Sequence, residues 1–107
     1  MSPLFVVLPI ALGIIAVGGH LGAVGILPRN PVAGVRVPAT MRSDAAWRAG
    51  HAASRLPAVV GLLVTGAAAV FASHGDDGTA AKVLEVVAAL AALAWVLIAA
   101  SRAASRA

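Results

Sequence analysis

The residues able to do chemistry in this chain gather in one short connection between apolar blocks, "GVRVPATMRSDAAWRAGH", residues 34–51. This connection holds three of the eight basic residues, one of the two tryptophans and one of the three histidines. Arginine, histidine and aspartate at close spacing suit the binding of an anionic headgroup, a peptide carboxylate or an acidic protein surface. The elements around the connection must therefore position these side chains.

A short helix is expected over residues 44–55, with Ser43 as its N-cap, since serine accepts hydrogen bonds from the free N–H groups of a first turn. Helical spacing places every large side chain of this segment on one stripe. The stripe consists of Asp44, Trp47, Arg48, His51 and Arg55. Alanine, glycine and serine make up the remaining surface, which suits the close approach of another backbone. Asp44 and Arg48 are expected to form an ion pair worth roughly 0.3 kcal/mol.

These residues allow two interpretations of the stripe. Arginines and a tryptophan at a membrane boundary anchor a helix among the lipid headgroups, and this needs no ligand. Alternatively, the stripe and Arg36 form a defined binding site. Catalysis is not expected, because Ser43 and His51 lie about two turns apart and capping already accounts for Ser43.

The composition places the chain in a lipid bilayer. Of its 107 residues, 61% are hydrophobic and 11% are charged, and the mean hydropathy is +0.97. Soluble domains carry about 25% charged residues. There is no cysteine, which excludes disulfides and thiolate metal sites, and we expect no cofactor and no metal. The net charge of +4 comes from basic residues that flank apolar spans, so no nucleic-acid partner is expected.

Three apolar segments are each long enough to cross a hydrocarbon core of roughly 30 Å. The sequence predicts a single all-α integral membrane domain over residues 1–107, with spans at about 3–27, 56–73 and 79–100, a loop and short helix at 28–55, an outer turn at 74–78 and a tail at 101–107. No basic residue precedes Arg29, which argues against a cleaved signal peptide. Pro57 either kinks one continuous helix or begins a fresh one.

The two connections carry opposite charge, which predicts the orientation. The first connection holds Arg29, Arg36, Arg42, Arg48 and Arg55, the second holds Asp76 and Asp77, and Arg102 and Arg106 follow the third span. By the positive-inside bias, the first connection and the C-terminus face the cytoplasm and the N-terminus faces out. The expected location is the bacterial inner membrane.

Small and polar residues inside the spans suggest further contacts. His20 is either a functional intramembrane group or a residue hydrogen-bonded to a neighbouring helix. Gly18 and Gly22 form one face of small residues, and Gly61, Thr65 and Ala69 form another, for packing within the chain or in a homo-oligomer. Lys82 and Glu85 are expected to pair or to reach water, with a metal or toxin contact alongside His74, Asp76 and Asp77 as the alternative.

The order of residues in the connection resembles the signature of the SdpI family of bacterial membrane proteins. The matching positions are Asn30, Gly34, Val35, Arg36, Val37, Pro38, Thr40, Ser43, Asp44, Trp47 and His51. The family's characterised member protects its producer from a secreted peptide toxin and signals by drawing a transcriptional repressor to the membrane. The resemblance implies a non-enzymatic protein of toxin immunity or signal reception, with a peptide toxin and a cytoplasmic regulator as partners.

The resemblance also implies that the candidate binding site is the signature itself together with Arg48. The site residues expected are Asn30, Gly34, Arg36, Pro38, Thr40, Ser43, Asp44, Trp47, Arg48 and His51. The characterised member has further membrane helices, so the resemblance covers the signature-bearing three-helix unit. The alternative function is a small accessory subunit that packs against a larger membrane complex through its alanine and glycine faces.

Overall fold

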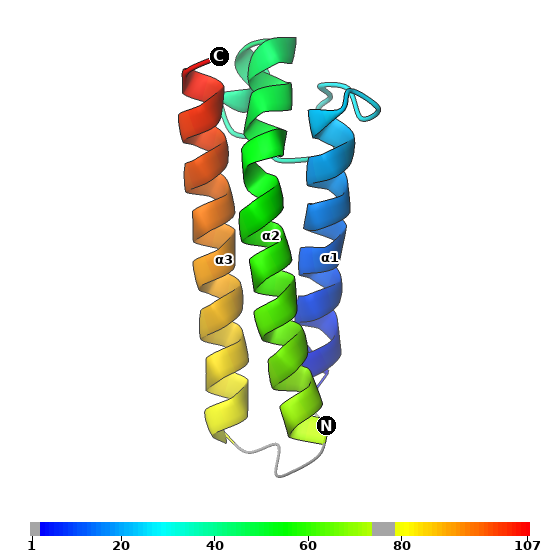
Figure 1. The fold of residues 1–107 in the computed structure, drawn as a ribbon, viewed down its shortest axis with the longest axis vertical. Helices are drawn as coiled ribbons and strands as arrows, with labels where there is room; N and C mark the ends of the chain where they lie inside the picture. The colour runs from blue at the N-terminus through cyan, green and yellow to red at the C-terminus, as the bar shows by residue number, and fades with distance from the viewer. Residues whose placement is uncertain (1–2, 74–78) are drawn as a thin grey trace.

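Three long helices make up most of the chain in a computed structural model that describes residues 3–73 and 79–107 (Figure 1). They are α1 (Leu4–Ala23), α2 (Asp44–Ser73) and α3 (Thr79–Ser105), and a short 3-10 helix, η1 (Thr40–Arg42), lies in the linker between α1 and α2. The described residues form no strand. Each long helix is apolar and long enough to cross a membrane, so the expected all-α fold with three spans is confirmed.

The central helix of the bundle is α2. It runs antiparallel to α1 and α3 and packs along both, whereas α1 and α3 contact each other little (Figure 1). The linker and the C-terminus lie together at one end, which we call the linker end. The molecule measures 47 × 22 × 19 Å, and its long dimension matches a bilayer of about 40–45 Å including headgroups.

Small residues bring the helices together, and large apolar residues face outward. A Cβ atom on Gly61 would lie 2.5 Å from the Cβ of Ala92, so α2 and α3 approach closely at this glycine. Leu12 of α1 is buried against the same region. Ile14 and Leu63, by contrast, are 67% and 65% exposed. This pattern fits lipid, because lipid solvates large aliphatic side chains while close backbone contact holds helices together.

The two predicted faces of small residues differ in how they pack. Gly61 and Thr65 are buried inside the bundle, and the Thr65 hydroxyl donates to the Gly61 carbonyl at 2.8 Å, so this face serves internal packing. Gly22 contacts α2, whereas a Cβ on Gly18 would meet nothing within 4 Å. Of the pair Gly18 and Gly22, only Gly22 therefore packs against another helix.

The ends of the helices differ from the predicted spans for identifiable reasons. The first span was expected to continue to Leu27, but α1 ends at Ala23, since Gly25 adopts a φ of +85° that terminates the helix before Pro28 is reached. The Leu27 N–H then turns back to the Leu21 carbonyl at 3.0 Å. The last helix continues to Ser105, so most of the expected tail is helical.

Pro57 lies inside one continuous helix, which settles the two alternatives left by the sequence. α2 runs from the stripe into the membrane without a break, and Pro57 is fully buried in it. Two turns of this helix have serine or threonine hydroxyls bonded to their own backbone, including Ser54 Oγ to the His51 carbonyl at 2.8 Å. Such bonds satisfy buried hydroxyls where water is absent.

Lys82 and Glu85 do not form an ion pair, which was one of the two expected arrangements, and only Lys82 has the other, access to water. Glu85 is fully buried in the row of α3 residues that includes Ala89 and Ala92, and its carboxylate oxygens have no hydrogen-bond partner in the described part of the chain. Lys82 is exposed on another face. The contact suggested for Glu85 with His74, Asp76 and Asp77, like the outer turn at 74–78, lies outside the described residues.

Gly61 and Gly66 form a matched pair for testing helix packing. Gly61→Ala should lower the free energy of unfolding by about 1–3 kcal/mol, because its new methyl group overlaps Ala92. Gly66→Ala should leave stability unchanged or raise it by up to about 1 kcal/mol, because its Cβ meets nothing within 4 Å and alanine favours the helix. Unfolding in mixed micelles by SDS titration measures both. Equal effects would contradict the packing described here.

Candidate functional site

The linker is shaped at its start by the side chain of Asn30. The Asn30 Nδ2 donates to the Pro28 carbonyl at 2.7 Å, and its Oδ1 accepts from the N–H groups of Val32 and Ala33 at 2.9 and 2.7 Å. An asparagine that bonds its own neighbouring backbone fixes a tight turn. This signature residue therefore directs the segment 33–37 back across the bundle.

His51 fastens this segment to α2. The Val35 N–H donates to Nε2 at 2.9 Å, so Nε2 carries no proton, and the proton on Nδ1 is donated to the Trp47 carbonyl at 2.7 Å. The imidazole is fully buried and lies against the indole of Trp47, with ring centroids 4.1 Å apart. Both nitrogens are occupied by backbone groups, which leaves neither for a ligand.

Two glycines leave the space that these rings occupy. A Cβ on Gly22 of α1 would lie 2.4 Å from the His51 ring, and a Cβ on Gly34 would lie 2.8 Å from both the His51 Nε2 and the Trp47 ring. Gly34 also adopts a φ of +100°, which favours glycine. The indole N–H of Trp47 donates to the Leu27 carbonyl at 2.9 Å. Gly22, Gly34, Trp47 and His51 together form what we call the ring cluster, where α1, the linker and α2 meet.

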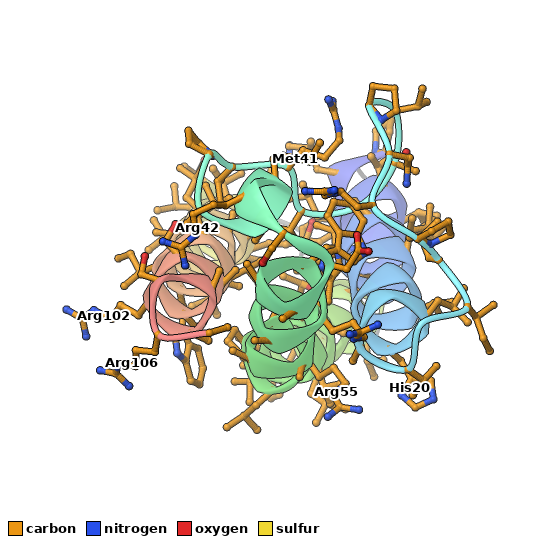
Figure 2. All side chains as sticks on the ribbon, turned by 90° about the horizontal axis from the view of Figure 1, so that it is seen from above. His20, Met41, Arg42, Arg55, Arg102 and Arg106 are labelled. Carbon is orange, nitrogen blue, oxygen red and sulfur yellow. The ribbon has the colours of Figure 1, made fainter. Side chains whose placement is uncertain are left out.

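Thr40 and Arg42 connect the linker to α3. The buried Thr40 hydroxyl donates to the Val35 carbonyl at 2.7 Å and accepts from the Val37 N–H at 3.1 Å, which closes the turn around Pro38. Its methyl group packs on Gly50, where α2 also meets the α3 backbone. Arg42 donates to the Ala104 carbonyl at 2.8 Å, which also accepts from the Ala107 N–H at 3.2 Å, and so joins the linker to the C-terminal end of α3. Figure 2 shows Arg42 beside that helix end.

At the N-terminus of α2, the predicted cap is present but the predicted ion pair is not. Ser43 Oγ accepts from the Ala46 N–H at 3.0 Å, so its role as N-cap is confirmed. Asp44 pairs with Arg29 of the linker at 3.4 Å, not with Arg48 as expected. Arg29 also donates to the Met41 carbonyl at 2.9 Å, which holds its guanidinium beside the start of the helix.

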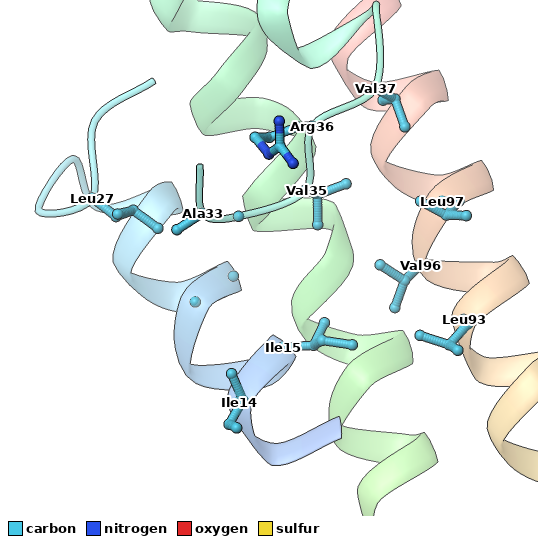
Figure 3. A pocket seen from close by; sticks show the side chains of 13 residues that line it. Ile14, Ile15, Leu27, Ala33, Val35, Arg36, Val37, Leu93, Val96 and Leu97 are labelled. Atoms are coloured by element: carbon cyan, nitrogen blue, oxygen red, sulfur yellow. The ribbon is translucent and has the colours of Figure 1, made fainter. Parts of the chain in front are cut away.

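The exposed arginines line two separate hollows. Arg48 borders a hollow of about 210 Å³ together with Arg29, Asp44 and Trp47. Arg36 stands at the linker end of a larger apolar groove of about 420 Å³ between α1 and α3 (Figure 3). We call this the lateral groove. Neither the Arg36 nor the Arg48 guanidinium has a hydrogen-bond or ion-pair partner among the described residues.

His20 lies away from the linker. It is exposed on α1, and its Nδ1 lies 3.3 Å from the guanidinium of Arg55 on α2. Figure 2 shows both side chains on the side of the bundle opposite η1. A hydrogen bond to a neighbouring helix was one of the two alternatives for His20, and this contact agrees with it.

The structure thus brings part of the predicted site together and separates the rest. Gly34, Thr40, Trp47 and His51 are tied to one another and to the linker backbone, whereas Arg36 and Arg48 face different hollows. Pro38 is exposed in the turn that Thr40 closes. The described residues contain no group of three or more side chains able to hold a metal ion. Sequence reasoning missed the contacts of Leu27, Arg29 and Arg42, because each depends on a partner distant along the chain.

Gly34 and Gly25 provide a test of the ring cluster. Both adopt a positive φ, but a Cβ on Gly25 meets nothing within 4 Å. Gly34→Ala should therefore destabilise the protein by about 1–3 kcal/mol more than Gly25→Ala, since only the former presses on the two rings. In a Trp95→Phe background, the emission of Trp47 should shift to longer wavelength in Gly34→Ala alone. Equal stability losses and no shift would contradict the ring cluster.

Comparison with known proteins gives one family and no further match. The model of the SdpI/YfhL protein family matches residues 26–101, which contain the whole linker signature, α2 and most of α3. Comparisons with curated protein sequences and with solved structures found no significant match. Three apolar helices and a match over most of the chain make this a multi-pass membrane protein that belongs to the SdpI/YfhL family.

Proposed function

We propose that this protein acts in immunity to a secreted peptide toxin or in the reception of a membrane signal, with residues 30–51 as its functional site. The observation that carries the proposal is that two unpaired guanidinium groups, Arg36 and Arg48, border hollows at one end of a bundle whose linker is held in place by the ring cluster. An unpaired arginine beside an apolar groove, with a second at a nearby hollow, suits a partner that carries anionic groups. The partner proposed is a peptide toxin or a cytoplasmic regulator with such groups.

The contacts already made by the reactive side chains support the proposal of a non-enzymatic role. His51 has both nitrogens bonded to the backbone, and Ser43 Oγ accepts from the Ala46 N–H. A hydroxyl nucleophile needs a base within hydrogen-bonding reach, and no such pair is formed by these two residues. Membership of the SdpI/YfhL family is consistent with this inference.

The proposed orientation places the linker end in the cytoplasm of a bacterial cell and the starts of α1 and α3 outside. Five arginines belong to the first connection and the start of α2, and two more follow Ala100 of α3. Basic residues near the ends of spans favour the cytoplasmic side. In this orientation, Arg36 and Arg48 lie at the end of the bundle nearest the compartment in which a regulator would bind.

Cysteine labelling tests this orientation, because the chain has no native cysteine. Thr79→Cys at the start of α3 should react with a membrane-impermeant maleimide in intact spheroplasts. Ala45→Cys at the start of α2 should react only after the membrane is permeabilised. Both positions are exposed, so differences in reactivity report the side of the membrane. The reverse pattern would reject the orientation.

A survival assay tests the immunity role. The protein should raise the survival of a toxin-sensitive strain challenged with the peptide toxin, and Arg36→Gln and Arg48→Gln should lower it, since loss of a charge-assisted contact weakens binding roughly tenfold. Arg102→Gln is the matched control, because Arg102 is exposed and borders neither hollow. Membrane levels of each variant are compared by immunoblotting. No protection by the wild type, or equal effects of all three substitutions, would argue against immunity.

A further inference from the structure

The functional proposal uses the Arg36 end of the lateral groove but not its aliphatic walls. Its walls are Ile14 and Gly18 of α1 and Leu93 and Leu97 of α3, and the linker segment 33–37 closes it at one end (Figure 3). Because α1 and α3 contact each other little, the groove opens sideways toward the surrounding bilayer. Its volume of about 420 Å³ lies within the roughly 300–1,000 Å³ typical of sites for small molecules.

The chemistry of the groove changes along its length. The helical walls are aliphatic, whereas the closed end carries Arg36, whose guanidinium has no partner among the described residues. An unpaired guanidinium next to an apolar channel favours a ligand with a phosphate at one end and a hydrocarbon chain at the other. We propose that the lateral groove binds one anionic phospholipid, with an acyl chain between α1 and α3 and the phosphate at Arg36.

Two further observations favour a lipid over a second copy of the chain. A transmembrane helix lying between α1 and α3 would run into the segment 33–37, which Val35 fastens to His51 at 2.9 Å. A single acyl chain can end beneath that segment. In addition, the arginine-rich end attracts anionic lipids, which supply the negative surface of the cytoplasmic leaflet. The lipid headgroup would then complete the polar end of the groove.

Gly18 allows the groove to be filled without disturbing the bundle. A Cβ at this position meets nothing within 4 Å, so Gly18→Leu should extend into the groove. Gly66 of α2 is equally open but borders none of the hollows described, so Gly66→Leu is its matched control. Leu93→Trp fills the groove from the opposite wall, where Leu93 is already 37% exposed.

Native mass spectrometry of the delipidated protein, titrated with palmitoyl-oleoyl phosphatidylglycerol or phosphatidylcholine, tests the proposal. The wild type should bind one phosphatidylglycerol with about fivefold preference over phosphatidylcholine. Gly18→Leu and Leu93→Trp should weaken binding at least about tenfold, while Gly66→Leu should not. Arg36→Gln should bind both lipids equally, whereas Arg102→Gln should keep the preference.

Three outcomes would overturn the proposal. The first is that Gly18→Leu and Leu93→Trp both bind lipid as tightly as the wild type does. The second is that Arg36→Gln and Arg102→Gln change the preference for phosphatidylglycerol equally. The third is a change of oligomeric state in Gly18→Leu without any change in lipid binding, which would assign the groove to a second copy. The titration contains no toxin, so its result is independent of the survival assay. A protein that binds lipid but gives no protection would refute the proposed function alone.

Discussion

His51 holds the linker end of this protein through two hydrogen bonds that require a neutral imidazole. Its Nε2 accepts from the Val35 N–H and its Nδ1 donates to the Trp47 carbonyl. A buried N–H without an acceptor costs about 1–3 kcal/mol, so the position of the linker depends on this ring. Arg36 is adjacent to Val35 in the chain, and its placement at the lateral groove therefore depends on the same bond.

The fold was largely predictable, because long apolar runs and flanking arginines reflect the bilayer directly. The N-cap at Ser43 was predictable for a local reason: its partner is the N–H of Ala46 in the first turn. The five large side chains predicted to share one stripe of α2 do not share one environment. Trp47 and His51 are buried, while Asp44, Arg48 and Arg55 are exposed.

The contacts that sequence reasoning could not find are those between distant segments. Asp44 has Arg48 one turn away, yet it pairs with Arg29, because the linker folds back over the start of α2. Arg42 reaches the carbonyl of Ala104 at the far end of the chain. The Lys82 and Glu85 pairing failed for a related reason, since the rotation of α3 that buries Glu85 against its neighbours leaves Lys82 on the surface.

Three glycines at the linker end occupy places where even a methyl group would overlap another side chain. A Cβ would lie 2.4 Å from His51 at Gly22, 2.8 Å from the rings at Gly34 and 2.6 Å from Thr40 at Gly50. These positions lie on three different elements of the chain, and all three must be small for α1, the linker and α2 to pack as they do. A genome sequence with the arginine, tryptophan and histidine in the same order, but with larger residues at these three sites, would have to adopt another path between its first two membrane helices.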